Sequence, residues 1–407
     1  MKNILRIIVR EIRFIAASKL YILALLAFPI IDCLFLGGIY ISGSLTELPI
    51  AVIDQDNSKI SRNIVRYFDA SPDMEIKYRL SNVSELEDLF ARQKAFLGIY
   101  IPKDLQKNIK RQKPQKIPVY INSSNYIAGN LLDSDVSTII AVIGAGVKHT
   151  ALMKRGFSSK QAMETVLIVK NESEKLFNPA LDYNLYLTPG LWLSVIQQLL
   201  ILAGVLTLAT EYDFKRLRTA LKIARGSLPA ALIKVFAAKT VIYMCAAYIH
   251  FEILYRIIFP LFKIPIAYSA SAAAALSMCF AFACISCGLL LASVLKTRLD
   301  ALKGCLLISA PAFLLSGYTW PLEQMPVLLQ KIMQLIPLAP FLKGFTKIYN
   351  QDLGITFSGE FAAHLLVLGS AYFAAAYLIM LLRMRRQKKI SIFKRGGEIK
   401  NFQSVRS

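Results

Sequence analysis

Among the polar side chains inside stretches of this sequence that are otherwise long and apolar, five are candidates for function. They are Asp32, Gln197, His250, Glu252 and Arg256. Polar and charged groups are costly in such surroundings, so they tend to mark ion or substrate routes, or pairs that hold helices together. Glu252 and Arg256 have the i, i+4 spacing of an ion pair on one helix face. Asp32 has no basic partner nearby in the sequence, which makes it the best single functional candidate among them.

The sequence gives little support for catalysis or for metal binding. The chain contains no Gly-Lys dipeptide, so the phosphate-binding loop of nucleotide hydrolases is absent, and its histidines form no H-E-x-x-H motif. Cys279, Cys284 and Cys287 have the C-x4-C-x2-C spacing of an iron–sulfur ligand set. They lie in an apolar stretch rich in Ala and Ser, where cysteine acts as a small packing residue. We therefore expect no catalytic residue, no metal and no cofactor bound directly to this chain.

The elements that hold these residues are membrane spans. Of the 407 residues, 55% are hydrophobic, and a helix that crosses a bilayer needs about 20 apolar residues. Six stretches meet that need: Leu20–Ile41, Leu191–Ala209, Ala231–Pro260, Ala270–Leu295, Ala301–Tyr318 and Phe361–Leu382. The fold class expected is an α-helical polytopic membrane protein with six transmembrane helices.

The net charge of +22 resides largely in basic residues that flank these spans. When six spans are threaded in order, the basic flanks fall on one side, which is typical of the cytoplasmic side. Both termini are therefore expected in the cytoplasm, and the charge indicates membrane anchoring and no nucleic-acid partner. Residues 1–19 are expected to form an amphipathic interfacial helix, 20–42 the first span, 187–382 a five-helix region and 383–407 a basic tail.

Residues 43–186 are expected to form an external, periplasmic α/β domain. Pro49–Asp54, Ala95–Pro102 and Lys116–Asn122 have the composition of strands. Ser58–Ala70 and Ser84–Arg92 have helical spacing and open with a serine that can cap, and Asn130–Lys175 is predicted to be mostly helical.

Prolines interrupt the apolar sequence between the last two spans, in residues 318–350. Gly317 ends a span, Trp320 suits a membrane interface, and Pro321 and Pro326 suit a helix start, where a missing N–H costs little. Glu323 near that start would be favoured by the helix dipole. Pro337 and Pro340 are expected to break the helix that follows, before a second short helix. This predicts a re-entrant or interfacial hairpin of two short helices on the outer face.

These residues resemble the membrane subunits of type-2 ATP-binding-cassette (ABC) exporters, over nearly the whole chain. SGYTWPLEQMP, which includes Met325, is similar to that family's S-G-aromatic-x-x-P-x-E-x-M-P segment. Leu48–Ile76 and Ala95–Arg111 resemble the opening of the external domain in a bacterial subgroup. The resemblance implies a bacterial inner-membrane permease that exports a hydrophobic or amphipathic substrate. It also implies a second permease subunit, identical or paralogous, and cytoplasmic ABC ATPase subunits that bind ATP-Mg.

The resemblance further implies that residues 211–230 form the loop that docks into the ATPase. The family's loop is acidic and contains Gly-Thr, and here Arg216 and Leu217 replace the usual small residues. The candidate coupling residues are Glu211, Lys215, Arg216, Leu221 and Arg225.

Two other classes stay open, together with engagement of a periplasmic adaptor. One is a membrane-anchored external binding or adaptor protein, which would not need residues 211–226. The other is a proton-coupled secondary transporter that uses Asp32 or Glu252 as its proton carrier.

Overall fold

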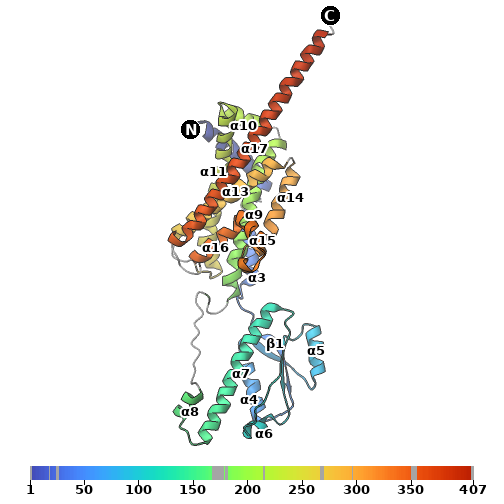
Figure 1. Ribbon diagram of the computed structural model, residues 1–407, viewed down its shortest axis with the longest axis vertical. Coiled ribbons are helices and arrows are strands. Elements are labelled where there is room, and N and C mark those ends of the chain that lie inside the picture. The colour runs from blue at the N-terminus through green and yellow to red at the C-terminus, as the bar shows by residue number, and fades with distance from the viewer. Residues whose placement is uncertain are drawn as a thin grey trace. The chain divides into compact units, whose positions relative to one another are not determined.

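The computed structural model describes residues 2–17, 19–23, 27–166, 178, 182–213, 216–265, 270–295, 297–349 and 355–404 (Figure 1). The chain divides into two compact units. The first comprises Met1–Gly43 with Lys175–Ser407 and is here called the helical unit, and the second comprises Ser44–Glu174 and is here called the α/β unit.

The α/β unit contains a four-stranded sheet. Its elements in chain order are β1 (Leu48–Asp54), α4 (Lys59–Asp69), β2 (Met74–Arg79), α5 (Val83–Ala91), β3 (Leu97–Ile101), α6 (Leu105–Lys110), β4 (Val119–Ile121), α7 (Tyr126–Lys154) and α8 (Ser159–Val166). The strand order is β2-β1-β3-β4. β1 pairs in parallel with β2 and β3, and β4 pairs antiparallel to β3.

Alternation along β1 supplies both faces of this sheet. Ile50 and Val52 pack into a core that α4, α6 and α7 share, whereas Ala51 and Ile53 face α5 on the other side. Such burial on both faces suits a central parallel strand.

The turn after β1 is set by local hydrogen bonds. The Oδ1 atom of Asp54 accepts from the backbone N–H groups of Asp56 and Asn57, each at 3.0 Å. Ser58 caps α4 by accepting from the N–H of Ser61, and Ser61 Oγ reciprocates by accepting from the Ser58 N–H.

The strands and helices predicted for this unit are present, with additions. β1, β3, β4, α4, α5 and α7 match the predicted segments, but β2 was not predicted. The alternation in its sequence MEIKYR was the available signal. The predicted cap of α5 is wrong, because this helix begins at Val83 with Asn82 as its N-cap and Ser84 lies inside it. Residues 167–175, the expected end of the long helical segment, lie outside the described residues.

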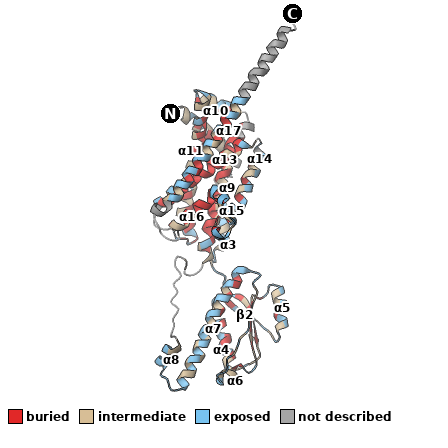
Figure 2. Cartoon of the chain, viewed as in Figure 1, coloured by how far each residue is buried: buried red, intermediate tan, exposed pale blue. Residues whose placement is uncertain are grey.

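Helix α7 is far longer than the sheet requires. Its 29 residues bury only Ala128, Gly129, Leu132 and Val136, all in the N-terminal half. The remainder is coloured as exposed or intermediate over most of its length in Figure 2. An apolar helix with so little burial leaves a side-chain surface that the sheet does not use.

The helical unit is built from α-helices. In chain order they are α1 (Lys2–Ala17), α2 (Lys19–Ile22), α3 (Phe28–Tyr40), α9 (Tyr183–Asp213), α10 (Leu217–Ala224), α11 (Leu228–Ile253), the π-helical η2 (Leu254–Ile258), α12 (Phe259–Leu261), α13 (Ala270–Val294), α14 (Arg298–Leu315), the 3₁₀ turn η3 (Leu322–Gln324), α15 (Val327–Leu335), α16 (Leu338–Tyr349) and α17 (Ile355–Ser404).

Helix α13 lies at the centre of this unit and packs against α9, α11, α16 and α17. It crosses α9 at a pair of glycines. A Cβ atom on Gly288 would lie 2.1 Å from the Ile201 carbonyl oxygen, and one on Gly204 would lie 2.3 Å from the Ile285 carbonyl oxygen. Small residues permit such backbone contact between membrane helices. Cys284 and Cys287 are buried in the same helix as free thiols.

The predicted count of six spans is only partly reproduced. Five described helices are long and apolar enough to cross a membrane: Tyr126–Lys154, Tyr183–Ala209, Leu228–Leu261, Ser271–Val294 and Gly359–Arg386. Four of them correspond to predicted spans. The remaining one, Tyr126–Lys154, is α7 of the α/β unit. The predicted first span contains the 13-residue α3, and the predicted fifth is the 18-residue α14, which carries Arg298, Asp300 and Lys303.

The proline-rich segment forms two short helices, as predicted, but two prolines act differently. Pro326 precedes α15 as its N-cap, and Pro321 precedes only the single turn η3. Pro337 separates α15 from α16, whereas Pro340 lies in the first turn of α16. That position does not break a helix, because the first-turn N–H groups have no partner within the helix.

Candidate functional site

Helix α1 packs along the helical unit with one face and exposes another. Ile7 is fully buried, and α1 contacts α10 and α11. The opposite side presents Leu5, Val9 and Ile12, with exposed fractions of 61%, 41% and 50%. Spacing of i, i+4 and i+7 makes these three a continuous apolar stripe on a helix that also carries several arginines.

A buried cluster of charges joins α1, α9 and α11. The ammonium group of Lys239 lies 2.7 Å from Glu11 Oε1 and 3.1 Å from Glu211 Oε1, and these three side chains are 1–3% exposed. Lys239 also donates to the Thr207 carbonyl oxygen at 3.1 Å. Charges removed from water are tolerated only when they are paired and hydrogen-bonded, so this cluster fixes three helices in one arrangement.

Arg10 completes the cluster and extends it toward α10. Its Nη2 atom lies 3.1 Å from Glu211 Oε1 and 3.2 Å from Oε2, and it approaches the Arg216 carbonyl oxygen at 3.4 Å. Two carboxylates and two cations leave the cluster without net charge. The guanidinium of Arg216 lies 3.9 Å from the ring centroid of Phe14 on α1, a cation–π contact.

The position of Glu211 corrects a prediction. It was expected in an exposed cytoplasmic loop, but α9 continues to Asp213 and Glu211 is buried on it. The helix continues because Lys239 and Arg10 compensate the carboxylate, a pairing between distant parts of the chain. Glu211 therefore acts inside the helical unit, behind the segment proposed to meet a partner.

Helix α10 is the element in the predicted coupling loop that faces outward. Leu217, Ala220 and Ala224 are buried, while Arg218 and Lys222 are exposed. Of the remaining predicted coupling residues, Leu221 is half-buried on α10 and Arg225 is its C-cap with φ of 50°. Lys215 lies outside the described residues.

The C-terminal end of α10 is held to the neighbouring helices α1 and α11. Lys234 of α11 donates to the carbonyl oxygens of Ala224 at 3.3 Å and Arg225 at 3.2 Å, and Asn3 of α1 donates to Ala224 at 3.3 Å. Cations near a helix C-terminus stabilise its free carbonyl groups. In Figure 1 the N-terminus and α10 lie at one end of the helical unit and α15 and α16 at the other.

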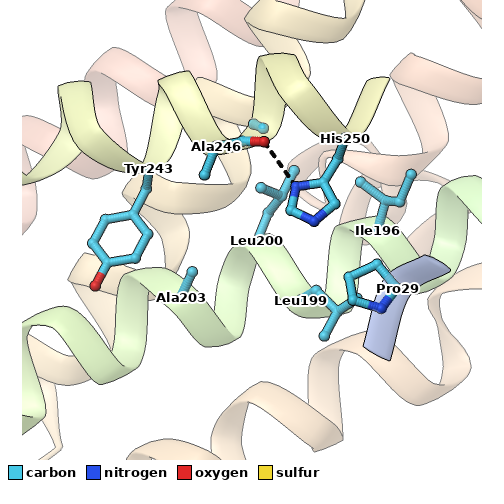
Figure 3. Close-up of a pocket in the computed structure, with 9 residues that line it drawn as sticks. Pro29, Ile196, Leu199, Leu200, Ala203, Tyr243, Ala246 and His250 are labelled. Atoms are coloured by element: carbon cyan, nitrogen blue, oxygen red, sulfur yellow. Dashed lines mark hydrogen bonds between the residues drawn. The ribbon is translucent and has the colours of Figure 1, made fainter. Parts of the chain in front are cut away.

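His250 lines a small cavity between α3, α9 and α11 (Figure 3). The cavity measures about 20 Å³, room for about one water molecule. Nδ1–H of His250 donates to the Ala246 carbonyl oxygen at 2.7 Å, within the same helix. Pro29 contributes to the lining, but Asp32 does not. The structure therefore does not bring these two polar candidates, His250 and Asp32, together around this cavity.

The other polar candidates divide into unpaired and paired groups. Among the described residues, Asp32 Oδ2 and both side-chain heteroatoms of Gln197 are buried without a hydrogen-bond partner. Glu252 and Arg256 form the i, i+4 ion pair that their spacing predicts, with Arg256 76% exposed. Arg256 lies in η2, a π-helical turn that interrupts α11 before Pro260.

At the far end of the unit, Tyr318 is fastened to α9. Tyr186 donates to the Tyr318 carbonyl oxygen and Tyr318 donates to the Tyr186 carbonyl oxygen, with the two rings stacked at a centroid distance of 5.4 Å. Trp320 is 59% exposed beside them. Gly317, with φ of 90°, makes the turn that precedes this stretch.

Glu323 and Met325 occupy the turn between Pro321 and Pro326. Glu323 pairs with Lys343 of α16 at 3.3 Å, both side chains being exposed. Hydrogen bonding to its own backbone N–H and to Lys343 lowers the pKa of Glu323 below its ordinary value. Glu323 lies in the single turn η3 and not at the start of α15, so its stabilisation by a helix dipole stays a prediction. Met325 packs against a small apolar cluster around Met333.

Gly190 of α9 allows the ring of Tyr318 to pack closely against that helix. A Cβ atom at Gly190 would lie 2.5 Å from Tyr318 Cε1. Gly190→Ala should therefore displace the ring and lower the free energy of unfolding by about 1–3 kcal/mol. Thermal unfolding of the detergent-purified protein would measure this. Gly38→Ala is the control, because a Cβ there meets nothing within 4 Å. Equal unfolding temperatures for the two variants would contradict the tight packing.

Glu11, Arg10 and Lys239 were not predicted as a site from the sequence. Lys239 lies within the predicted span Ala231–Pro260, and a lysine at such a position requires a partner. That signal was available, although its partner Glu11 lies 228 residues away.

A family model described as ABC-2 family transporter protein matches residues 19–382. The chain belongs to this family. It is a multi-pass membrane protein and a permease subunit of an ABC transporter, as the resemblance implied.

Three relatives span nearly its full length. The probable multidrug ABC transporter permease YbhR of Escherichia coli K12 is 24% identical over 364 residues, covering 87% of this chain and 92% of the relative. The inner membrane transport permease YhhJ of the same organism is 22% identical and covers 93% and 96%. The linearmycin resistance permease protein LnrN of Bacillus subtilis 168 is 24% identical and covers 92% and 98%.

Proposed function

We propose that this permease exports a hydrophobic or amphipathic substrate, driven by ATP that a separate cytoplasmic subunit hydrolyses. That cytoplasmic subunit would also bind the ATP-Mg. The observation that carries the proposal is the buried cluster of Arg10, Glu11, Glu211 and Lys239, which links α1, α9 and α11 directly behind α10. A force applied to α10 would reach the spans through this rigid connection.

The docking surface would be the outward face of α10, with Arg218 and Lys222. Its buried face is held by α1 and α11, so movement of α10 would carry both helices along. In this arrangement α1 lies on the cytoplasmic membrane surface, with the stripe of Leu5, Val9 and Ile12 toward lipid. The termini would then be cytoplasmic and the turn around Trp320 would lie at the outer face.

The relatives' names and the family support the proposed substrate class and assembly. A multidrug permease and a linearmycin resistance permease among the relatives support export of drug-like or lipid-like compounds. Two permease subunits, identical or paralogous, would form the pathway. The α/β unit would be the external domain and a contact point for a periplasmic adaptor. Family membership favours ATP-driven export over a proton-coupled carrier or a membrane-anchored adaptor.

Charge reversal on α10 tests the docking surface. The double variant Arg218→Glu/Lys222→Glu should lose most of the ATPase subunit that copurifies with the wild-type chain in mild detergent, because both side chains would contact that subunit. Mass spectrometry and an ATPase assay measure this. Lys303→Glu is the matched control, an exposed cation on α14. Retention of a stoichiometric ATPase by the double variant would contradict docking through α10.

A further inference from the structure

The α/β unit contains a groove of about 660 Å³ between α7, α6 and the segment after α6. Ligand pockets measure about 300–1,000 Å³, so this volume suits a small molecule. Its walls are apolar and come from both sides: Leu105, Ile109, Ile117, Ile140, Ile143 and Val147. The groove lies along the C-terminal half of α7, beyond Val136, the last residue that this helix buries.

The polar groups at this groove include several cations. Lys113, Lys148 and Arg155 line it, and Arg155 donates to Gln112 Oε1 across one end. No carboxylate is among the lining residues. The sequence has no Asp or Glu from Leu105 to Leu132 or from Val136 to Met163. An apolar cavity bordered by cations is complementary to a molecule with an apolar body and a negative head group.

The helix dipole and contact with a second copy of the chain each explain this groove less well than an amphipathic anion does. Lys154 and Arg155 at the end of α7 complement the helix dipole, but this does not explain a cavity or Lys113 across it. A second copy of this surface would bring the same cations against one another, which is unfavourable. An amphipathic anion satisfies both the apolar walls and the basic border.

We propose that this groove binds an amphipathic anion, with its chain along α7 and its carboxylate or phosphate between Lys148, Arg155 and Lys113. Such a site goes beyond ATP-driven export, because binding here requires no ATPase. Failure of the experiment below would therefore leave the proposed function untouched.

Photolabelling of the full chain tests the site. The chain would be placed in nanodiscs of phosphatidylcholine and exposed to a photoactivatable dodecanoic acid, with its uncharged methyl ester as the comparison. Mass spectrometry should find the acid attached within residues 105–117 and 140–155, and the ester attached there far less. Lys148→Glu should reduce labelling by the acid about tenfold, the loss that follows removal of one charge-assisted contact.

A pair of glycines on α7 provides a matched steric test. A Cβ atom on Gly144 or Gly146 would meet nothing within 4 Å, and only Gly144 lines the groove. Gly144→Leu should therefore fill the groove and reduce labelling several-fold, while Gly146→Leu should leave it unchanged. Both replacements favour the helix, so neither threatens folding.

Different results would identify the source of the anion or show that a second copy of the chain occupies the groove instead. Competition by phosphatidylglycerol in the nanodisc would identify a membrane phospholipid, and competition by added dodecanoate alone would identify a free carboxylic amphiphile. Equal labelling by acid and ester, or labelling that Gly144→Leu does not alter, would overturn the proposal. Loss of a dimer in Gly144→Leu without change in labelling would assign the groove to a second copy.

Discussion

Replacing Lys239 by Met should lower the free energy of unfolding by about 3–5 kcal/mol, the cost of leaving a buried charge without its partner. Lys239 is the only cation in contact with Glu11 among the described contacts of that carboxylate, and it also contacts Glu211. Met keeps the length and removes the charge. Unfolding of the detergent-purified chain, followed by heat or denaturant, measures the loss.

A second substitution separates charge from packing. The double variant Glu11→Gln/Lys239→Met restores electrical balance, since Arg10 still pairs with Glu211. It should recover much of the lost stability, as expected for coupled sites. ATP-driven transport should stay reduced, because the link from α1 to α11 is gone.

Lys234→Met is the matched control on the same helix. Within the described part of the chain, Lys234 donates only to the carbonyl oxygens of Ala224 and Arg225 at the C-terminal end of α10, so this change should cost about 1 kcal/mol. If Lys239→Met lowered the free energy of unfolding no more than Lys234→Met does, the charged cluster would not be a buried junction between the helices.

Gly288→Ala should be the most damaging methyl addition in the helical unit. The new Cβ would lie 2.1 Å from the Ile201 carbonyl oxygen and 2.8 Å from Gly204 Cα, both backbone atoms that cannot rotate away. Helices α9 and α13 would have to separate, at a cost of about 3 kcal/mol. Thermal unfolding and the yield of folded protein from membranes measure the effect.

The partner glycine and a distant one provide the controls. Gly204→Ala should cost a similar amount, and the double variant less than the sum, because one separation of the helices serves both methyl groups. Gly359→Ala should be harmless, since a Cβ there meets nothing within 4 Å. Additive costs for Gly204→Ala and Gly288→Ala would contradict a shared crossing.

Local patterns in the sequence predicted which helices and strands form better than they predicted which of these elements pack against one another. Apolar length located α9, α11, α13 and α17, and prolines located the two short helices α15 and α16. Each of these signals lies within one element. Strand β2 was missed although its signal is equally local, since Met74, Ile76 and Tyr78 alternate with three charged residues.

The pairings that form the candidate site could not be predicted in this way. Glu211 was assigned to a loop because the family resemblance placed residues 211–230 there, and only the pairing with Lys239 and Arg10 shows why the helix includes it. The groove likewise depends on residues near 110 meeting residues near 148. Contacts between distant segments leave no periodicity in the sequence.

Site-specific crosslinking tests the central claim most directly, that α10 is the contact for an ATP-hydrolysing subunit. A photo-crosslinking amino acid would replace Lys222 on α10 or, as the control, Lys331 on α15 at the opposite end of the helical unit (Figure 1). Irradiation of intact membranes should join a subunit with a phosphate-binding loop to the chain carrying the probe at position 222 and not at position 331. Crosslinking of such a subunit from position 331, with none from position 222, would contradict both the orientation and the coupling role proposed for α10.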